Sequence, residues 1–84
     1  MSKIEKLIGK LFSGNSDNNF DFDDLRKAVL HFGFTERNKG TSHYVYNRKD
    51  IYERINLQRQ KNSSQAKAYQ VKQVREILNK HFIK

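Results

Sequence analysis

The spacing of apolar residues changes at Gly33, and this change limits the folds that the chain can adopt. Before Gly33, apolar side chains recur every three or four residues in two segments, as they do on one face of a helix. After it, short segments of apolar and polar residues alternate, as in half-buried strands, and helical spacing returns near residue 69. We therefore expect helices over residues 3–12, 23–32 and 69–81, and strands over residues 34–37, 42–47 and 52–58.

The expected order of elements, α-α-β-β-β-α, predicts an α+β fold. Strands joined by short turns form a three-stranded antiparallel sheet, and helices with one apolar stripe pack on one of its faces, which leaves the other face free for a ligand. Without the first helix, the order α-β-β-β-α is that of a double-stranded-RNA-binding domain (dsRBD). We expect one domain over residues 1–84, with a helix-and-loop extension over 1–19 and a dsRBD-like core over 20–84.

Positive charge is concentrated in the second part of the chain. Residues 1–33 contain five Lys/Arg and five Asp/Glu, whereas residues 34–84 contain twelve Lys/Arg and four Asp/Glu. The whole net charge of +8 therefore lies after residue 33. Such segregation favours a nucleic-acid partner, and the alternative is a basic solvated surface that keeps a small protein in solution.

The residues that the chain lacks exclude several classes of protein. There is no cysteine, and this excludes disulfides, thiolate nucleophiles and zinc-finger ligand sets. No histidine pair or His–carboxylate cluster has the spacing of a metal site, so we expect neither a metal nor a cofactor. No apolar run reaches the roughly 18–20 residues of a membrane span, and there is no apolar signal segment at the start. We therefore expect a cytoplasmic protein.

The segment NKGTSHYVYN, residues 38–47, places His43 beside a glycine turn at the start of a strand. An imidazole, with a reference pKa of about 6.5, is suited to removing a proton from an RNA 2′-hydroxyl near neutral pH. On spacing alone, His43 is an ordinary strand-end residue that hydrogen-bonds to water. His31 and His81 lie in the last turns of expected helices, where the helix dipole favours a cation, and we interpret both as structural.

Further RNA contacts are predicted on the hairpin and in the basic loop that precedes the last helix. The cations would meet phosphates, and the glycine would let the RNA backbone approach. Ser42 would hydrogen-bond a phosphate or only hold the turn. Tyr44 and Tyr46 share one strand face and would either stack on unpaired bases or pack against neighbouring strands. The candidates are Arg37, Lys39, Gly40, Ser42, Tyr44, Arg54, Lys61 and Lys67.

Segments across nearly the whole chain resemble the HicA toxins, small ribonucleases of bacterial toxin–antitoxin pairs. The segments "HFGF" and "KGTSHYVY" are similar to the glycine-serine-histidine hairpin of that family. The segments "INLQ" and "AKAYQVKQVREIL" resemble the strand, basic loop and final helix of a subgroup. The opening "MSKIEKLIGKLFSG" and "FDFDDL" resemble the N-terminal helical extension of the same subgroup.

The resemblance implies a metal-independent endoribonuclease, an mRNA interferase, with His43 as the general base and a HicB-type antitoxin as its inhibitor. Thr41 departs from the family pattern by separating Gly40 from Ser42, and Ala68 stands where the subgroup often has proline. Because no second histidine lies nearby in the motif, water or a lysine would protonate the leaving 5′-oxygen. The alternatives are a non-catalytic RNA-binding module of the same fold and an adaptor that contacts an acidic protein.

Overall fold

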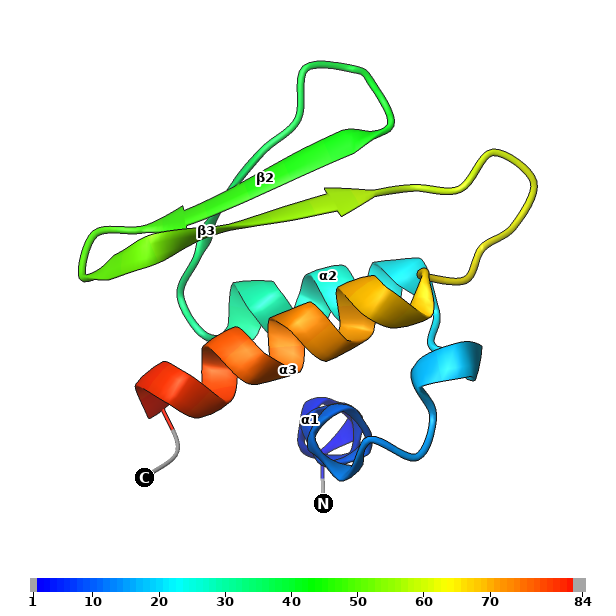
Figure 1. The fold of residues 1–84 in the computed structure, drawn as a ribbon, viewed down its shortest axis with the longest axis horizontal. Helices are drawn as coiled ribbons and strands as arrows, with labels where there is room; N and C mark the ends of the chain where they lie inside the picture. The colour runs from blue at the N-terminus through cyan, green and yellow to red at the C-terminus, as the bar shows by residue number, and fades with distance from the viewer. Residues whose placement is uncertain (1, 83–84) are drawn as a thin grey trace.

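The computed structural model describes residues 2–82, and Figure 1 shows their arrangement. The expected α+β fold, with the order α-α-β-β-β-α, is confirmed, and a short 3-10 helix lies between the first two helices. The elements are α1 (Lys3–Ser13), η1 (Asp17–Asn19), α2 (Phe22–His31), β1 (Thr35–Arg37), β2 (His43–Arg48), β3 (Ile51–Gln58) and α3 (Ala68–Phe82).

The observed ends lie within a residue or two of the expected ones, and two differences have physical causes. The turn after the second strand is shorter than expected, because β2 continues through Arg48, which pairs with Ile51 after a shift in register. The polar segment 13–19, expected as a loop, contains η1. A single 3-10 turn is too short to show a periodic apolar pattern, so the sequence carries no signal for it.

The molecule has three layers, which Figure 1 shows from the side. The antiparallel sheet has the order β1-β2-β3, so the three-residue β1 and the longer β3 form its two edges. Helices α2 and α3 cover one face of the sheet, and α1 crosses beneath them on the side away from the sheet. The opposite face of the sheet is left uncovered by helices, as the order of elements predicted.

Local signals explain where the first two helices begin and end. The side chain of Ser2 caps α1 by accepting a hydrogen bond from the amide of Glu5, and its hydroxyl donates to the Glu5 carboxylate. Asp21 caps α2 by accepting from the amide of Asp24. Gly14 ends α1 with φ of 74°, a left-handed conformation that glycine adopts without strain.

The core lies between the sheet and the helices, and the expected helical stripes supply half of its buried residues. Leu25, Ala28 and Val29 of α2 are fully buried, and so are Val71, Val74 and Leu78 of α3. The sheet contributes alternate residues, and the largest fully buried side chain is that of Tyr46. In α1 only Leu11 is completely buried, while Leu7, Ile8 and Phe12 are partly buried and pack against the core.

One arginine ties the N-terminal segment to the last helix. Arg75 of α3 forms two hydrogen bonds with the carboxylate of Asp17, at 2.7 and 2.9 Å, and donates a third to the carbonyl of Leu11. These hydrogen bonds hold the pKa of Asp17 below its usual value, although burial opposes the shift. The described part of the extension, residues 2–19, is therefore an integral layer of the fold.

Candidate nucleic-acid interface

The loop between β1 and β2 is organised by the side chain of Asn38. Its Oδ1 accepts a hydrogen bond from the amide of Gly40, and its Nδ2 donates to the carbonyls of Thr41 and His43. Gly40 has φ of 78°, which favours glycine at this position. The hydroxyl of Thr41, the residue that departs from the family pattern, accepts from the amide of His43 at 3.1 Å. The loop thus fixes the backbone of His43 from both sides.

His43 is exposed at the first position of β2, where it pairs with Gln58 of β3. Among residues 2–82, its hydrogen bonds are those of its backbone, and no described carboxylate orients its imidazole ring. The ring is therefore accessible to a ligand. The other two histidines differ: His81 bonds the carboxylate of Glu53 at 2.8 Å, in keeping with the structural role expected for it, and His31 packs edge-on against Phe32.

The uncovered face of the sheet, which we call the outer face, carries no carboxylate. Both strand carboxylates point to the helices, where Glu36 pairs with Arg26 and Glu53 pairs with Lys80. Tyr52 on this face is 100% exposed. By alternation and register, the outer face consists of Thr35, Arg37, His43, Val45, Asn47, Tyr52, Arg54, Asn56 and Gln58.

The two tyrosines of β2 point toward the helices. Tyr46 is fully buried, so the packing alternative holds for it and base stacking does not. Tyr44 is partly buried against Phe22, with ring centroids 5.4 Å apart, and the guanidinium of Arg26 lies 4.6 Å from its ring. The ring of Tyr44 therefore packs against residues of α2 in this structure. Its stacking on a base stays a prediction.

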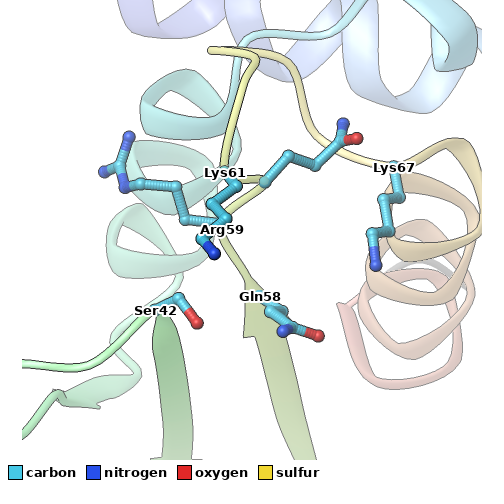
Figure 2. A pocket seen from close by; sticks show the side chains of 6 residues that line it. Ser42, Gln58, Arg59, Lys61 and Lys67 are labelled. Atoms are coloured by element: carbon cyan, nitrogen blue, oxygen red, sulfur yellow. The ribbon is translucent and has the colours of Figure 1, made fainter.

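A cationic cleft of about 530 Å³ opens beside His43, at the adjoining ends of β2 and β3 (Figure 2). Lys61 and Lys67 come from the basic loop, residues 59–67. Both were predicted as RNA contacts, and they line the same cleft as Ser42, which was predicted as a third. The backbone amide of Arg59 donates to the carbonyl of Ser42 at 2.8 Å, which joins this loop to the hairpin. The residues lining the cationic cleft are Ser42, Gln58, Arg59, Gln60, Lys61 and Lys67.

Arg59, which the sequence did not single out, is committed to the protein itself. Its guanidinium pairs with Asp23 of α2 at 2.6 Å and lies over the rings of Phe22 and Tyr44. The contact with Asp23 raises the pKa of Arg59 and lowers that of Asp23. Arg59 therefore holds the start of the basic loop against α2, while Lys61 and Lys67 form no ion pair among the described residues.

A smaller depression on the other side of the hairpin contains three more of the predicted residues. It is lined by Arg37, Lys39, Thr41, His43 and Val45. Arg54 lies farther along the outer face, where its Nε donates to Oδ1 of Asn47 at 3.1 Å. The structure thus brings most of the predicted residues together around the start of β2, but it places Arg54 nearer to the opposite end of the sheet.

A third cleft has a neutral lining. It lies between the ends of β2 and β3 and the first two turns of α3, and it has His43 in common with the hairpin depression. Its lining includes three of the glutamines in the chain, namely Gln58, Gln70 and Gln73. We call this group the amide cleft: His43, Asn56, Gln58, Tyr69, Gln70 and Gln73, with strand residues 44, 45 and 57 completing the wall.

The distribution of ion pairs shows which cations are available to a ligand. Between residues 34 and 82, four basic residues pair with carboxylates: Arg48, Arg59, Arg75 and Lys80. The other basic residues of this segment pair with no carboxylate of residues 2–82, and they are Arg37, Lys39, Lys49, Arg54, Lys61, Lys67 and Lys72. Five of these seven were predicted as RNA contacts.

Residues 2–82 contain neither a metal-binding cluster nor a membrane-spanning helix. No group of three or more His, Cys, Asp and Glu side chains there is placed to hold a metal ion. No helix in that range is both long enough and apolar enough to cross a membrane.

No protein-family model, curated protein or solved structure matches the chain.

Proposed function

We propose that the chain is a metal-independent endoribonuclease that cleaves mRNA, the toxin of a type II toxin–antitoxin pair. The observation that carries the proposal is the setting of His43. Its imidazole is exposed and free of hydrogen bonds to residues 2–82, and it lies where cations without carboxylate partners converge from the hairpin and the basic loop. The resemblance to HicA toxins supports the same assignment, and an enzyme that cleaves mRNA would act in the cytoplasm.

In this mechanism, neutral His43 removes the proton from a ribose 2′-hydroxyl. The resulting oxygen attacks the adjacent phosphorus, the bond from phosphorus to the 5′-oxygen breaks, and the products are a 2′,3′-cyclic phosphate and a 5′-hydroxyl. Water or a lysine gives the leaving oxygen its proton. General acid–base groups typically contribute about 10²–10⁴-fold in rate.

The surrounding cations bind the RNA and stabilise the transition state. Lys61 and Lys67 line the cationic cleft on one side of the hairpin, and Arg37 and Lys39 line the depression on the other. Cations placed where the phosphorane forms neutralise its additional negative charge. The hydroxyl of Ser42, which also lines the cationic cleft, is available to a phosphate oxygen.

An antitoxin of the HicB type would inhibit this enzyme by covering His43 and the basic surface around it. A covered imidazole cannot reach a 2′-hydroxyl, and covered lysines cannot meet phosphates. This partner is proposed from the resemblance to HicA toxins.

The second candidate is a non-catalytic RNA-binding module with the same surface. It is favoured by one observation: no described side chain orients the imidazole of His43, whereas catalytic bases are commonly held by a third group. Geometry in an unliganded enzyme is often looser than in its complex with substrate, so an imidazole that no side chain holds is compatible with the ribonuclease as well.

The test compares the wild type with His43→Ala, using His31→Ala as the matched control. His31 is also exposed, but it lies on α2, away from the hairpin. The purified proteins are incubated with mRNA and EDTA. Cleavage by the wild type and His31→Ala, with loss in His43→Ala and unchanged RNA affinity, supports the ribonuclease. Binding without cleavage by all three supports the RNA-binding module, and the absence of RNA binding supports the adaptor.

A further inference from the structure

Tyr52 has the most exposed large apolar side chain in the part of the chain that the structure describes, at 100% exposure. It is the second residue of β3, beside the turn that joins β2 to β3 at the left in Figure 1. His43 begins β2 at the opposite end of the sheet. Because Tyr44 and Tyr46 point toward the helices, Tyr52 is the tyrosine of the sheet whose ring is open to a ligand on the outer face.

Arg54 lies two residues from Tyr52 on the same face, and its side chain is held in place. Its Nε donates to Oδ1 of Asn47 at 3.1 Å, whereas its two terminal nitrogens form no hydrogen bond with residues 2–82. The planar fork of a guanidinium matches the oxygens of a phosphate. Arg54 therefore presents a positioned anion-binding group next to an exposed aromatic ring.

From these two neighbours we infer that the outer face binds a single-stranded segment of RNA, with a phosphate at Arg54 and an unpaired base stacked on Tyr52. The inference rests on the proposed ribonuclease function and adds a second contact with the substrate, away from the bond that is cleaved. An aromatic ring stacks on an unpaired base of any identity, whereas the bases of a duplex are already stacked within their helix. Tyr52 therefore selects single strands and does not select a sequence.

The charge of the outer face suits a polyanion. Arg37 of β1 and Arg54 of β3 both lie on this face, and neither pairs with a carboxylate of residues 2–82. The acid of the turn between β2 and β3, Asp50, is paired with Arg48 at 2.9 Å. A phosphate chain on this face would therefore meet cations without a facing carboxylate.

The composition of the outer face fits RNA better than a protein partner. Val45 and Tyr52 are its apolar side chains, and the others carry amide, hydroxyl, imidazole or guanidinium groups. The centre of a protein–protein interface is apolar and poor in charge, whereas a nucleic-acid interface is polar and positive. The amides of Asn56 and Gln58 can hydrogen-bond to phosphates and sugars between the two ends of the face.

The length of β3 sets how much RNA the outer face can hold. Gln58 pairs with His43 and lies six residues from Tyr52, a distance of about 20 Å at about 3.3 Å per residue. A strand stacked as in a duplex rises about 3.4 Å per nucleotide, so about six nucleotides cover this distance. A strand whose cleaved bond lies at His43 can therefore reach Tyr52 with its nearby nucleotides.

The test measures binding separately from cleavage, with a 2′-O-methyl decanucleotide of mixed sequence, which lacks the attacking hydroxyl. It is used alone and annealed to its complement. We expect Tyr52→Ala to weaken binding of the single strand about tenfold, as the loss of one stacked base does, and to leave binding of the duplex unchanged. Tyr52→Phe is the matched control, because it retains the ring and should bind as the wild type does.

Arg54→Ala tests the phosphate contact, with Lys6→Ala as its control. Lys6 is exposed on α1, so its loss removes the same charge from the far side of the helix layer (Figure 1). We expect Arg54→Ala to weaken binding of the single strand more than Lys6→Ala does, and to reduce the log–log salt slope by roughly 0.7.

A fluorescent reporter tests the position of the base directly. The chain has no tryptophan, so Tyr52→Trp introduces a single indole at the proposed stacking position. Because a stacked base quenches indole fluorescence, we expect the single strand to quench this variant and the duplex to leave it unchanged.

Unchanged affinity of Tyr52→Ala for the single strand, with no quenching in Tyr52→Trp, overturns the inference in favour of a protein partner on this face. Equal losses for single strand and duplex overturn the selection of unpaired bases, and equal losses in Arg54→Ala and Lys6→Ala overturn the phosphate contact. Cleavage of mRNA by the wild type alongside undiminished binding by Tyr52→Ala overturns this inference alone. Weakened single-strand binding by Tyr52→Ala, without cleavage of any natural RNA by the wild type, sustains the inference while refuting the ribonuclease.

Discussion

Tyr46 and Glu36 face each other across the pairing of β1 with β2, and the phenol of Tyr46 donates a hydrogen bond to Oε2 of Glu36. The same carboxylate receives two hydrogen bonds from Arg26 of α2, at 2.8 and 2.9 Å. Burial and the neighbouring carboxylate raise the pKa of Tyr46, so the phenol stays protonated and able to donate. The three groups attach the short strand β1 both to its neighbour and to the helix layer.

We expect Tyr46→Phe to lower the free energy of unfolding by about 1.5–3 kcal/mol, the usual contribution of a hydrogen bond to a charged group. The ring itself remains, so little apolar burial is removed. Urea denaturation measures the change. Tyr52→Phe is the matched control, because Tyr52 is fully exposed and should tolerate the change within about 0.5 kcal/mol. Equal stability of the two variants would show that the bond between Tyr46 and Glu36 contributes nothing.

Stability should fall in acid. Hydrogen bonds from arginines hold the pKa values of Asp17, Asp23 and Glu36 below their usual range. Hydrogen bonds from Lys80 and, to a smaller extent, from His81 lower the pKa of Glu53 to about 2. A carboxyl group whose pKa is lower in the folded state binds fewer protons there than in the unfolded chain. Its stabilising effect is therefore complete above the unfolded pKa of about 4 and is lost as pH falls through the folded value.

The measurement is the melting temperature from pH 7 down to pH 2. Above about pH 5, we expect these carboxylates to contribute little to any change in the melting temperature. Below about pH 4, we expect the melting temperature to decline steadily. Glu53→Gln should make the decline shallower, since it removes one of the groups that titrates differently in the two states. A decline as steep in that variant as in the wild type would mean that the ion pair with Lys80 does not persist in solution.

The double change Lys61→Ala with Lys67→Ala should weaken RNA binding and flatten its dependence on salt. Lysines meet phosphates as point charges and release counterions, so removing one phosphate-binding lysine should reduce the log–log slope by roughly 0.7 for a single strand. Stability should hardly change, because neither lysine forms an ion pair within residues 2–82. RNA titrations at several salt concentrations measure the slope.

The control for the lysine pair is Lys3→Ala with Lys6→Ala, which removes the same charge from exposed positions on α1. Helix α1 lies on the far side of the helix layer from the sheet (Figure 1). If both double variants show the same fall in affinity, the RNA responds to net charge and not to the cationic cleft.

The helices and strands could be predicted from the sequence because periodic apolar spacing reflects burial directly. Leu25, Val74 and their neighbours at helical spacing are buried as expected. The alternation along β2 predicted that Tyr44 and Tyr46 share a face, but it could not say which face the helices would cover. That choice depends on the packing of α2 and α3 on the sheet, which involves residues distant in sequence.

Within the candidate site, the exposure of His43 could be expected from the sequence. Which nearby basic residues form ion pairs could not be expected. Arg59 and Lys61 look alike in the sequence, yet only Arg59 is held by a carboxylate, and that carboxylate is 36 residues away. Gln70 likewise has no local sign of being buried, since glutamine is usually exposed. It is buried because it lies one turn before Val74 on the face of α3 that packs on the core, and no short motif marks that burial.

The hydrogen bonds of Arg75 to Asp17 and Leu11 join the N-terminal extension, which we expected to end at residue 19, to the last helix of the core. Leu11 is fully buried, and Leu7, Ile8 and Phe12 pack against the rest of the core from the same helix. A chain shortened to residues 20–84 would leave that apolar surface open to water and would leave the guanidinium of Arg75 without its carboxylate. The smallest cooperative folding unit therefore includes α1. The dsRBD-like order of elements begins at residue 20, but the segment that folds alone begins before it.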